Sequence, residues 1–302
     1  MTLYPPFPYH GSKRSVADEI WRRFGNPAHV VDPFCGSLAF LLQRPLHPSA
    51  APPCETVNDA DALLVNFWRA LKHDPDEVAY WASDPVSEID LTARHTWLRE
   101  RACERVELML EDPDWFDVKA AGWWGWGISQ WIGGQWGSST SRRRPSLGQP
   151  HGQGINRLVA RGELQQTFRM LAHRLRAVRL LCGDWTRCVT KSVLWHRPGK
   201  TMTAVFLDPP YSHDVRNKHL YAKENAEVST RVREWAIEHA NHPRLRIALA
   251  GLEGEHDMPS DWYSFPWQAC GATLRRVDGE RFNREVIWFS PTCLGLSGSP
   301  IF

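Results

Sequence analysis

The sequence predicts an α/β protein with a doubly wound (Rossmann-like) sheet. Two observations carry this prediction. Short apolar runs typical of buried strands alternate with segments of helical periodicity, and a turn-forming cluster directly follows the first of these runs. Such alternation builds a mostly parallel sheet whose strands are joined by helices. The 302 residues suffice for one large domain or two smaller ones.

The N-terminal part contains a complete β-α-β-α pattern. Residues 29–32 (HVVD) read as a strand, the turn PFCGS follows, and LAFLLQR reads as a helix. A second strand is expected at 54–58 (CETVN) and a second helix at 60–72. That helix has apolar residues at helical spacing, namely Leu63, Leu64, Phe67 and Leu71.

The C-terminal part continues the pattern. Strands are expected at 203–208 (TAVFLD), 245–251 (LRIALAG) and 284–290 (REVIWFS), with a helix at 227–240. Ahead of them, apolar residues step by four and three positions, which predicts an amphipathic helix. These residues are Leu164, Phe168, Leu171, Leu175 and Val178.

Composition excludes several classes of protein. Hydrophobic residues make up 42% and charged residues 23%, close to a soluble globular average, so the chain is not mainly disordered. No run approaches the roughly 18 apolar residues of a membrane span, and the first residues lack the apolar core of a secretory signal. The seven cysteines contain no C-x-x-C pair, and the 13 histidines show no metal-binding spacing. We therefore expect no metal, no membrane association and a reducing cytoplasm.

The net charge of +2 hides two opposite segments in the middle of the chain. Residues 76–118 have a net charge of −8, and residues 138–181 have nine arginines against Glu163, a net charge of +8. A basic segment suits the phosphates of nucleic acid. Arg142, Arg143 and Arg144 are the candidates for DNA contact, although three arginines in a loop can also be merely solvated.

Five of the 16 tryptophans lie inside the Gly-rich tract 120–139, in a stretch of 14 residues from position 123 to position 136. Gly, Ser, Pro and Gln dominate as far as residue 154, so we expect a loop or a mobile insert here. Two explanations of the tryptophans stay open. They contact DNA near a recognised base, or they pack a small subdomain.

The first strand end has the pattern of a nucleotide-binding turn. Asp32 ends the strand and Gly36 lies in the turn before the helix, which leaves backbone N–H groups directed at a ligand. Asp59 follows the second strand, where an acidic residue can accept hydrogen bonds from ribose hydroxyls. The absence of G-x-x-x-x-G-K-[ST] and G-x-G-x-x-G disfavours P-loop and NAD proteins. An ordinary tight turn remains the alternative.

A second candidate site follows the strand at 203–208. Asp208 is followed by Pro209, Pro210 and Tyr211, and two consecutive prolines stiffen the exit turn. The turn combines a carboxylate, a carbonyl and an aromatic face, which together can hold a planar amine. The alternative is a strand end that is simply stabilised by proline.

Four motifs in this order resemble the D12 class of S-adenosylmethionine-dependent DNA adenine-N6 methyltransferases. They are PFPYHGSKRSVADEIW, DPFCGS, NDADALLVNFWRALK and DPPY. The order is that of the subgroup with the bacterial GATC methylases and many phage enzymes. The resemblance implies a methyltransferase sheet formed by 1–75 and 178–302, which binds S-adenosylmethionine. It also implies an inserted, mainly helical target-recognition region at 76–177.

The resemblance also implies individual roles. The catalytic residues would be Asp208, Pro209, Pro210 and Tyr211. The cofactor S-adenosyl-L-methionine, released as S-adenosyl-L-homocysteine, would be bound by Tyr9, Gly11, Lys13, Asp32, Phe34, Gly36, Asp59, Asp184 and Trp185. Of these, Asp59 would hold the ribose, and Asp184 and Trp185 would lie beside the cofactor adenine. The sequence departs from the family pattern at Ser12 and Leu38, where glycine is usual.

The implied function is methyl transfer to N6 of an adenine flipped out of duplex DNA. Asp208 and the Pro209 carbonyl would accept the amine hydrogens, and Tyr211 would stack on the base with little need of its hydroxyl. We expect a monomer or weak dimer in a bacterial or phage-infected cell, with or without a restriction partner. Alternatives are N4-cytosine methylation, an RNA substrate, protein glutamine methylation, and a DNA-binding protein with a catalytically dead methyltransferase fold.

Overall fold

The computed structural model describes residues 3–9, 11–45, 54–101, 107–109, 111–112, 114–131, 136–137, 145, 154–195, 201–211, 220–267 and 285–295, with backbone alone for 220–226. The chain divides into two compact units that interleave in sequence. Unit 1 consists of Met1–Ser12, Gly36–Gln43 and Asn58–Arg187. Unit 2 consists of Lys13–Cys35, Arg44–Val57 and Cys188–Phe302.

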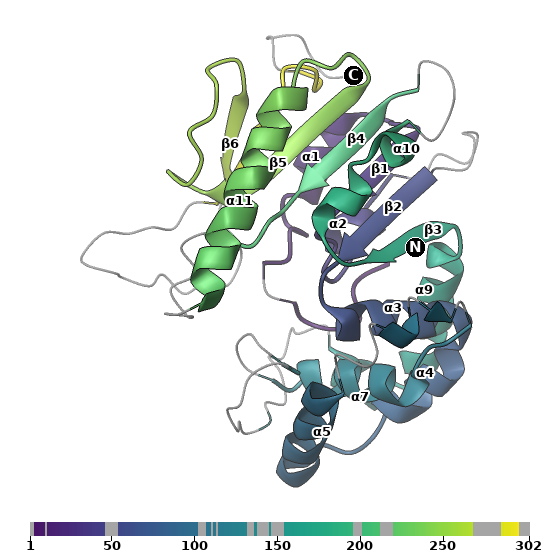
Figure 1. Cartoon of the computed structure of the whole chain (residues 1–302). Helices are drawn as coiled ribbons and strands as arrows, with labels where there is room; N and C mark the ends of the chain where they lie inside the picture. The colour runs from purple at the N-terminus through teal and green to yellow at the C-terminus, as the bar shows by residue number, and fades with distance from the viewer. Residues whose placement is uncertain are drawn as a thin grey trace. The chain divides into compact units, whose positions relative to one another are not determined.

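Within the described residues the sheet has seven strands in the order β3-β2-β1-β4-β5-β7-β6 (Figure 1). The strands are β1 (His29–Asp32), β2 (Cys54–Asp59), β3 (Val178–Cys182), β4 (Thr203–Leu207), β5 (Leu245–Leu252), β6 (Tyr263–Trp267) and β7 (Glu285–Phe289). β2, β1, β4 and β5 run parallel, whereas β7 runs antiparallel to both β5 and β6. A parallel sheet with an antiparallel edge is common in large α/β proteins, so the predicted α/β class is confirmed.

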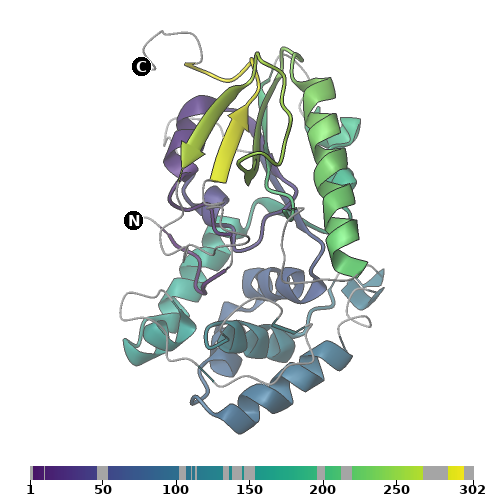
Figure 2. The same ribbon diagram turned by 90° about the vertical axis from the view of Figure 1, so that its left-hand side faces the viewer.

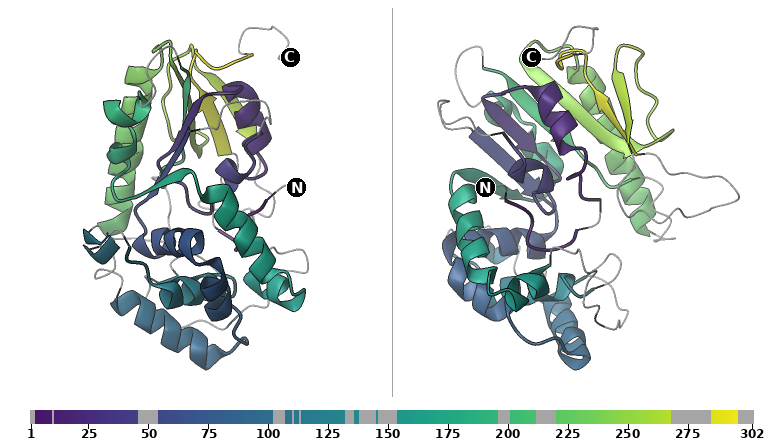
Figure 3. Two further views of the ribbon diagram at one scale, coloured as in Figure 1. Left: turned by 90° about the vertical axis from the view of Figure 1, so that its right-hand side faces the viewer. Right: turned by 180° about the vertical axis from the view of Figure 1, so that it is seen from behind.

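Helices cover both faces of the strands in unit 2. The helix α1 (Ala17–Phe24) lies on one face, and α10 (Lys191–Leu194) and α11 (Leu220–His239) lie on the other (Figure 2, Figure 3). β1 and β4 are buried along their whole length. Strands covered on both faces need apolar side chains on both. The apolar run of β4 is therefore continuous from residue 204 to residue 207, whereas β1 buries the polar residues His29 and Asp32 at its two ends.

The predicted strands at 29–32, 54–58, 203–208, 245–251 and 284–290 are confirmed to within one residue at each end. The helix expected at 227–240 begins earlier, at Leu220, and LAFLLQR forms only the four-residue helix α2 (Ala39–Leu42). The sequence prediction missed β6, which is an edge strand with mostly exposed side chains. An edge strand tolerates Pro266, because one side of its backbone needs no partner.

Unit 1 is built mainly from helices. They are α3 (Ala62–His73), α4 (Pro75–Ala82), α5 (Glu88–Glu100), α7 (Val118–Ile128), α8 (Ile155–Ala160) and α9 (Leu164–Leu175). The side chains of Asp61, Asp74, Ser87 and Asp117 cap α3, α4, α5 and α7 by accepting backbone N–H groups of the first turn. The two helices expected at 60–72 and after Leu164 are confirmed, and the described part of 76–177 is mainly helical, as predicted.

The prediction of a loop is wrong for residues 120–128 of the Trp-rich tract, because 118–128 form the helix α7. Residues 129–131 and 136–137 lie outside helices and strands, and the rest of the tract as far as residue 153, apart from Pro145, lies outside the described residues. The glycines of α7 suggest a turn in the sequence, but in the structure they lie where neighbouring groups leave no room for a side chain. A Cβ on Gly122 would lie 2.3 Å from the Trp81 Cβ, and one on Gly127 would lie 1.8 Å from a ring carbon of Trp136. The side chains of Trp124, Trp126, Trp131 and Trp136 are buried. The explanation that these tryptophans pack a subdomain is therefore confirmed for these four.

Candidate active site

The carboxyl end of β4 carries a compact cluster of charged groups in unit 2. Asp208 follows the strand, and its Oδ2 lies 2.9 Å from the Nζ of Lys13. The same Nζ lies 3.4 Å from Oε2 of Glu285, and the Tyr211 hydroxyl donates to that oxygen at 3.0 Å. Lys13 is only 3% exposed, so its two carboxylate partners replace water around the ammonium. Pro209 is buried and Pro210 exposed in the turn between these groups.

The pKa values follow from this crowding. Burial raises the pKa of Asp208 above 3.8; the Lys13 ammonium opposes the rise, while Glu285 and Glu255 add to it. Burial disfavours the charge of Lys13 as well, but the attraction of Asp208 and Glu285 outweighs it and raises the pKa of Lys13 above 10.5. Burial and the neighbouring carboxylates raise the pKa of Tyr211 well above 10.0. Lys13 is therefore charged and Tyr211 protonated at neutral pH.

The turn after β1 begins in unit 2. Asp32 is 1% exposed, and its Oδ1 accepts a hydrogen bond from the Phe34 backbone N–H at 3.3 Å. This bond folds the chain back directly after the strand, as the sequence pattern predicted. The side chain of Asp32 thus has a structural role in the turn.

In unit 1, Gly36, Asp59 and Tyr9 lie together. Oδ2 of Asp59 accepts the Gly36 N–H at 3.0 Å, and its Oδ1 accepts the Asp61 N–H at 2.9 Å. A Cβ on Gly36 would lie 2.8 Å from a ring carbon of Tyr9, so only glycine lets that ring approach the turn. Phe7 packs beside Tyr9 with a ring separation of 6.3 Å. The sequence singled out Tyr9, Gly36 and Asp59 as cofactor candidates one by one, but it did not predict that they contact one another.

The electrostatics of Asp59 differ from those of an ordinary surface carboxylate. Loss of solvation raises its pKa to about 6, and the nearby charge of Asp61 adds to the rise. The hydrogen bonds from the backbone of Asp61, Gly36 and Ala60 oppose the rise but do not cancel it. The charge of Asp59 therefore changes around pH 6.

The end of β3 is tied to the end of β2 within unit 1. The Gly183 N–H donates to the Asp59 carbonyl at 3.0 Å, and Asn58 Nδ2 donates to the Gly183 carbonyl at 2.9 Å. The exposed Asp184 accepts the Thr186 N–H at 2.9 Å and starts the short helix η1 (Trp185–Cys188), in which Trp185 is buried. Asp184 and Trp185, which the resemblance would place beside the cofactor adenine, thus lie just after the end of β3.

The N-terminal part of the chain matches a known protein family. Residues 9–99 match the family model of the D12 class N6 adenine-specific DNA methyltransferases. The resemblance drawn from the motifs is thereby confirmed over this segment, which is less than a third of the chain. No curated protein matches the chain.

The adenine methyltransferase match covers part of the set of predicted site residues. Seven of the predicted cofactor residues fall inside it, namely Tyr9, Gly11, Lys13, Asp32, Phe34, Gly36 and Asp59. Asp184, Trp185 and the run 208–211 fall outside it. In the described part of the chain, no group of His, Cys, Asp and Glu could hold a metal ion, and no helix is long and apolar enough to cross a membrane.

The two departures from the methyltransferase pattern differ in structure. Leu38 has a φ of 59°, the single non-glycine residue with positive φ among those described, and its side chain is 1% exposed. The backbone thus keeps a conformation that favours glycine, while the leucine side chain fills space in the protein interior. Ser12 is half-buried and follows Gly11, whose φ is 76°.

Two acidic residues near Asp208 were missed by the sequence analysis. Glu285 begins β7, and Glu255 follows β5, where its Oε2 accepts the Leu252 N–H at 2.9 Å. Glu285 could have been found only by knowing the direction of the last strand. An antiparallel last strand starts at the sheet edge where its parallel neighbours end, but the sequence does not show that direction.

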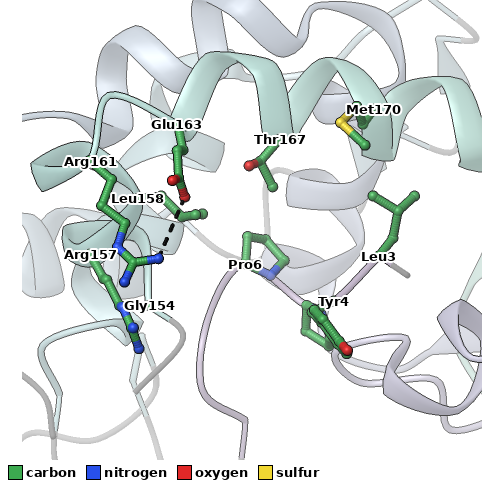
Figure 4. Close-up of a pocket in the computed structure, with 11 residues that line it drawn as sticks. Leu3, Tyr4, Pro6, Gly154, Arg157, Leu158, Arg161, Glu163, Thr167 and Met170 are labelled. Carbon is green, nitrogen blue, oxygen red and sulfur yellow. Dashed lines mark ion pairs between the residues drawn. The ribbon is translucent and has the colours of Figure 1, made fainter. Parts of the chain in front are cut away.

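The DNA-contact prediction for Arg142, Arg143 and Arg144 lies outside the described residues. Within the same basic segment, Arg157 and Arg161 line a cavity of about 290 Å³ in unit 1. Tyr4 and Pro6 line it from the N-terminal segment, and Arg161 lies 4.0 Å from Glu163 (Figure 4). The cavity therefore combines cationic and aromatic side chains.

Proposed function

We propose that this protein transfers a methyl group from S-adenosylmethionine to N6 of an adenine flipped out of duplex DNA. One observation carries the proposal. Asp208 and Tyr211, at the end of a buried parallel strand, contact the same ammonium group, that of Lys13. Lys13 belongs to the segment that matches the adenine methyltransferases, so the match and the Asp208 cluster meet at one residue.

The residues of the turn in unit 1 fit the cofactor. Asp59 accepts backbone N–H groups of Gly36, Asp61 and Ala60, and a carboxylate has about four acceptor positions in total. This count leaves one acceptor position for a ribose hydroxyl. The approach of Tyr9 to Gly36 supplies an aromatic surface beside this carboxylate. When bound, S-adenosylmethionine supplies an electrophilic methyl group on sulfur.

Asp208 would act on the target amine. Its Oδ2 faces Lys13, so Oδ1 is the oxygen that we assign to one N6 hydrogen, with the Pro209 carbonyl as acceptor of the other. Drawing both hydrogens toward acceptors localises the nitrogen lone pair, which otherwise delocalises into the purine ring. As the new N–C bond forms, one N6 hydrogen leaves as a proton to Asp208 and then to solvent. Lys13 keeps Asp208 ionised and ready to accept it.

Tyr211 would hold the extruded base. Flipping a base out of the duplex costs a few kcal/mol, and stacking on an aromatic ring returns roughly 1–3 kcal/mol. The Tyr211 ring is fixed through its hydroxyl bond to Glu285. We therefore revise the expectation that this hydroxyl matters little.

We assign residues 76–177 to target recognition. The support is the basic segment, in which Arg142, Arg143 and Arg144 remain candidates, and the cavity lined by Arg157 and Arg161. Guanidinium groups suit phosphate oxygens, and Tyr4 offers a stacking surface in the same cavity.

Salt dependence tests this assignment. The double change Arg157→Gln and Arg161→Gln should flatten the log–log salt dependence of DNA affinity by about 0.9 for each phosphate that the variant no longer neutralises. Arg169→Gln is the matched control, because Arg169 lies on the next helix and donates to Asp76 at 2.7 and 3.0 Å. An unchanged slope in the double variant would show that the cavity does not contact DNA.

Transfer of tritium from labelled S-adenosylmethionine to duplex DNA tests the activity itself. We expect label in DNA that also shifts in a gel. DNA that shifts without acquiring label would instead identify a binding protein with a catalytically dead fold.

A further inference from the structure

Glu285 lies where the fold brings a distant residue to the end of β4. β7 pairs antiparallel with β5, so that Glu285 stands opposite Leu252, the last residue of β5. β4 and β5 run parallel, with Leu207 opposite Leu249. The first residue of β7 therefore reaches the edge of the sheet at which Asp208 follows β4.

One oxygen of Glu285 joins two residues of the proposed mechanism. Its Oε2 accepts the Tyr211 hydroxyl at 3.0 Å and lies 3.4 Å from Lys13 Nζ. The Lys13 ammonium bridges Glu285 and Asp208 and lies 5.3 Å from the centre of the Tyr211 ring. The Glu285 side chain is 17% exposed, so water competes little for these contacts.

The charges in this cluster do not balance. Two carboxylates face the single ammonium of Lys13, which leaves the three groups with a net charge of −1 when all are ionised. Such an excess favours a cationic reactant and the positive charge that moves from sulfur to nitrogen during methyl transfer. Removing the charge of Glu285 would remove this excess.

We propose that Glu285 is a positioning residue for methyl transfer, which holds the Tyr211 ring through its hydroxyl and holds Lys13 between the two carboxylates. This inference rests on the proposed function. Glu285 does not touch the target amine. It acts through Tyr211 on the extruded base, and through Lys13 on the orientation of Asp208.

Three variants separate the two contacts. Tyr211→Phe removes the hydroxyl but keeps the ring and the Glu285 charge. Glu285→Gln keeps an acceptor for the hydroxyl but removes the charge, and Glu285→Ala removes both. Glu253→Ala is the control, because Glu253 is an exposed carboxylate one residue beyond β5.

We expect Glu285→Ala to lower kcat at least about tenfold, the effect of losing one hydrogen bond to a charged group. Glu285→Gln and Tyr211→Phe should each lose less. With 2-aminopurine at the target adenine, Glu285→Ala and Tyr211→Phe should both weaken the fluorescence of the extruded base, whereas Glu285→Gln should keep it. Glu285→Ala should lower kcat by a smaller factor in the Tyr211→Phe background than in the wild type, because Tyr211→Phe has already removed the shared hydrogen bond.

The outcomes distinguish this inference from the proposed function. A wild-type protein that transfers no methyl group to DNA contradicts the proposed function, and this role of Glu285 falls with it. If the wild type is active and the kcat of Glu285→Ala is within twofold of the wild-type kcat, only the positioning role of Glu285 is contradicted. If thermal melting shows that Glu285→Ala does not fold, Glu285→Gln decides, and normal kcat with normal pH dependence would overturn the role of its charge.

Discussion

The two candidate sites hold their carboxylates by different means. In unit 1, the oxygens of Asp59 accept backbone N–H groups, and the turn beside it contains two left-handed residues, Gly36 with a φ of 45° and Leu38 with a φ of 59°. In unit 2, Asp208 is held by the side chain of Lys13 on a backbone stiffened by two prolines. One site is built from main-chain groups and the other from side chains.

This difference separates binding from chemistry. Main-chain donors are fixed by the turn and carry no net charge, which suits a carboxylate that must stay in one place to hold a ribose. A side-chain cation can instead adjust the proton affinity of its partner. The predictions below treat Asp59 as a binding group and Asp208 as a reacting group.

The largest expected effect is on turnover. Asp208→Ala should lower kcat at least about a hundredfold, because removing a transition-state acceptor costs about 3 kcal/mol. The affinity for S-adenosylhomocysteine should stay near that of the wild type. Single-turnover kinetics and calorimetric titration measure the two quantities.

Asp261→Ala is the control for this change, since Asp261 is an exposed carboxylate in the same unit. Near-normal turnover of Asp208→Ala would remove Asp208 from the mechanism. A large loss of cofactor affinity would instead show that the two carboxylates do not divide their tasks as proposed.

Asp59 should make cofactor binding depend on pH. Its pKa of about 6 means that the proton-free acceptor is lost as the pH falls below that value. We expect the Kd for S-adenosylhomocysteine to rise toward about tenfold per pH unit below 6. Asp59→Asn should bind weakly at pH 8 and show no such dependence. A Kd in the wild type that is flat between pH 5 and 8 would contradict the role of Asp59.

The same group should affect stability with the opposite sign. The folded state binds a proton at Asp59 with a pKa of about 6, against 3.8 for the ordinary carboxyl. The contribution of Asp59 to the free energy of unfolding therefore rises as the pH falls from about 6 to about 4. The difference between wild type and Asp59→Asn in urea unfolding, measured across this range, isolates that contribution. A difference that does not change with pH would contradict the raised pKa.

Lys13→Met should change the chemistry of the side-chain site without changing the pH dependence at Asp59. An opposite charge in contact lowers a carboxyl pKa by roughly 1–3 units. Without Lys13 the pKa of Asp208 should rise further, so the acid limb of kcat/KM should move to higher pH. The midpoint of cofactor binding should stay near 6. An acid limb that does not move would show that Lys13 does not keep Asp208 ionised.

The smallest expected effect concerns the left-handed turn. Leu38→Ala and Leu38→Gly both remove a buried side chain, but only glycine relieves the positive φ, which costs other residues roughly 1–2 kcal/mol. Leu38→Gly should therefore be more stable than Leu38→Ala by about 1 kcal/mol in urea unfolding. Equal stability would mean that this backbone conformation is not strained.

The main-chain site was largely predictable from sequence, because its determinants are local. A strand ending at Asp32, a glycine at position 36 and an acid at the end of the next strand were enough to locate the turn. In the side-chain site, the sequence indicated only the run from Asp208 to Tyr211 as a local motif. The ion pairs of Lys13 with Asp208 and Glu285 depend on strand order and on the direction of β7, which sequence periodicity does not contain.

The loop prediction for the Trp-rich tract failed for a related reason. Glycine in a sequence indicates a turn, since it tolerates unusual backbone angles. In α7 it instead makes room for tryptophan rings from other segments, as at Gly127 beneath Trp136. Long-range packing of this kind overrides local propensity, and one sequence gives no sign of which use of glycine applies.

The identity of the methylated base tests the central claim most directly. Duplex DNA is incubated with the protein and methyl-labelled S-adenosylmethionine, digested to nucleosides and separated by chromatography. We predict label in N6-methyldeoxyadenosine with the wild type and at most about 1% of that amount with Asp208→Ala under single-turnover conditions. Label in N4-methyldeoxycytidine, in the protein itself, or equally with both proteins would contradict the assignment of Asp208 to the adenine amine.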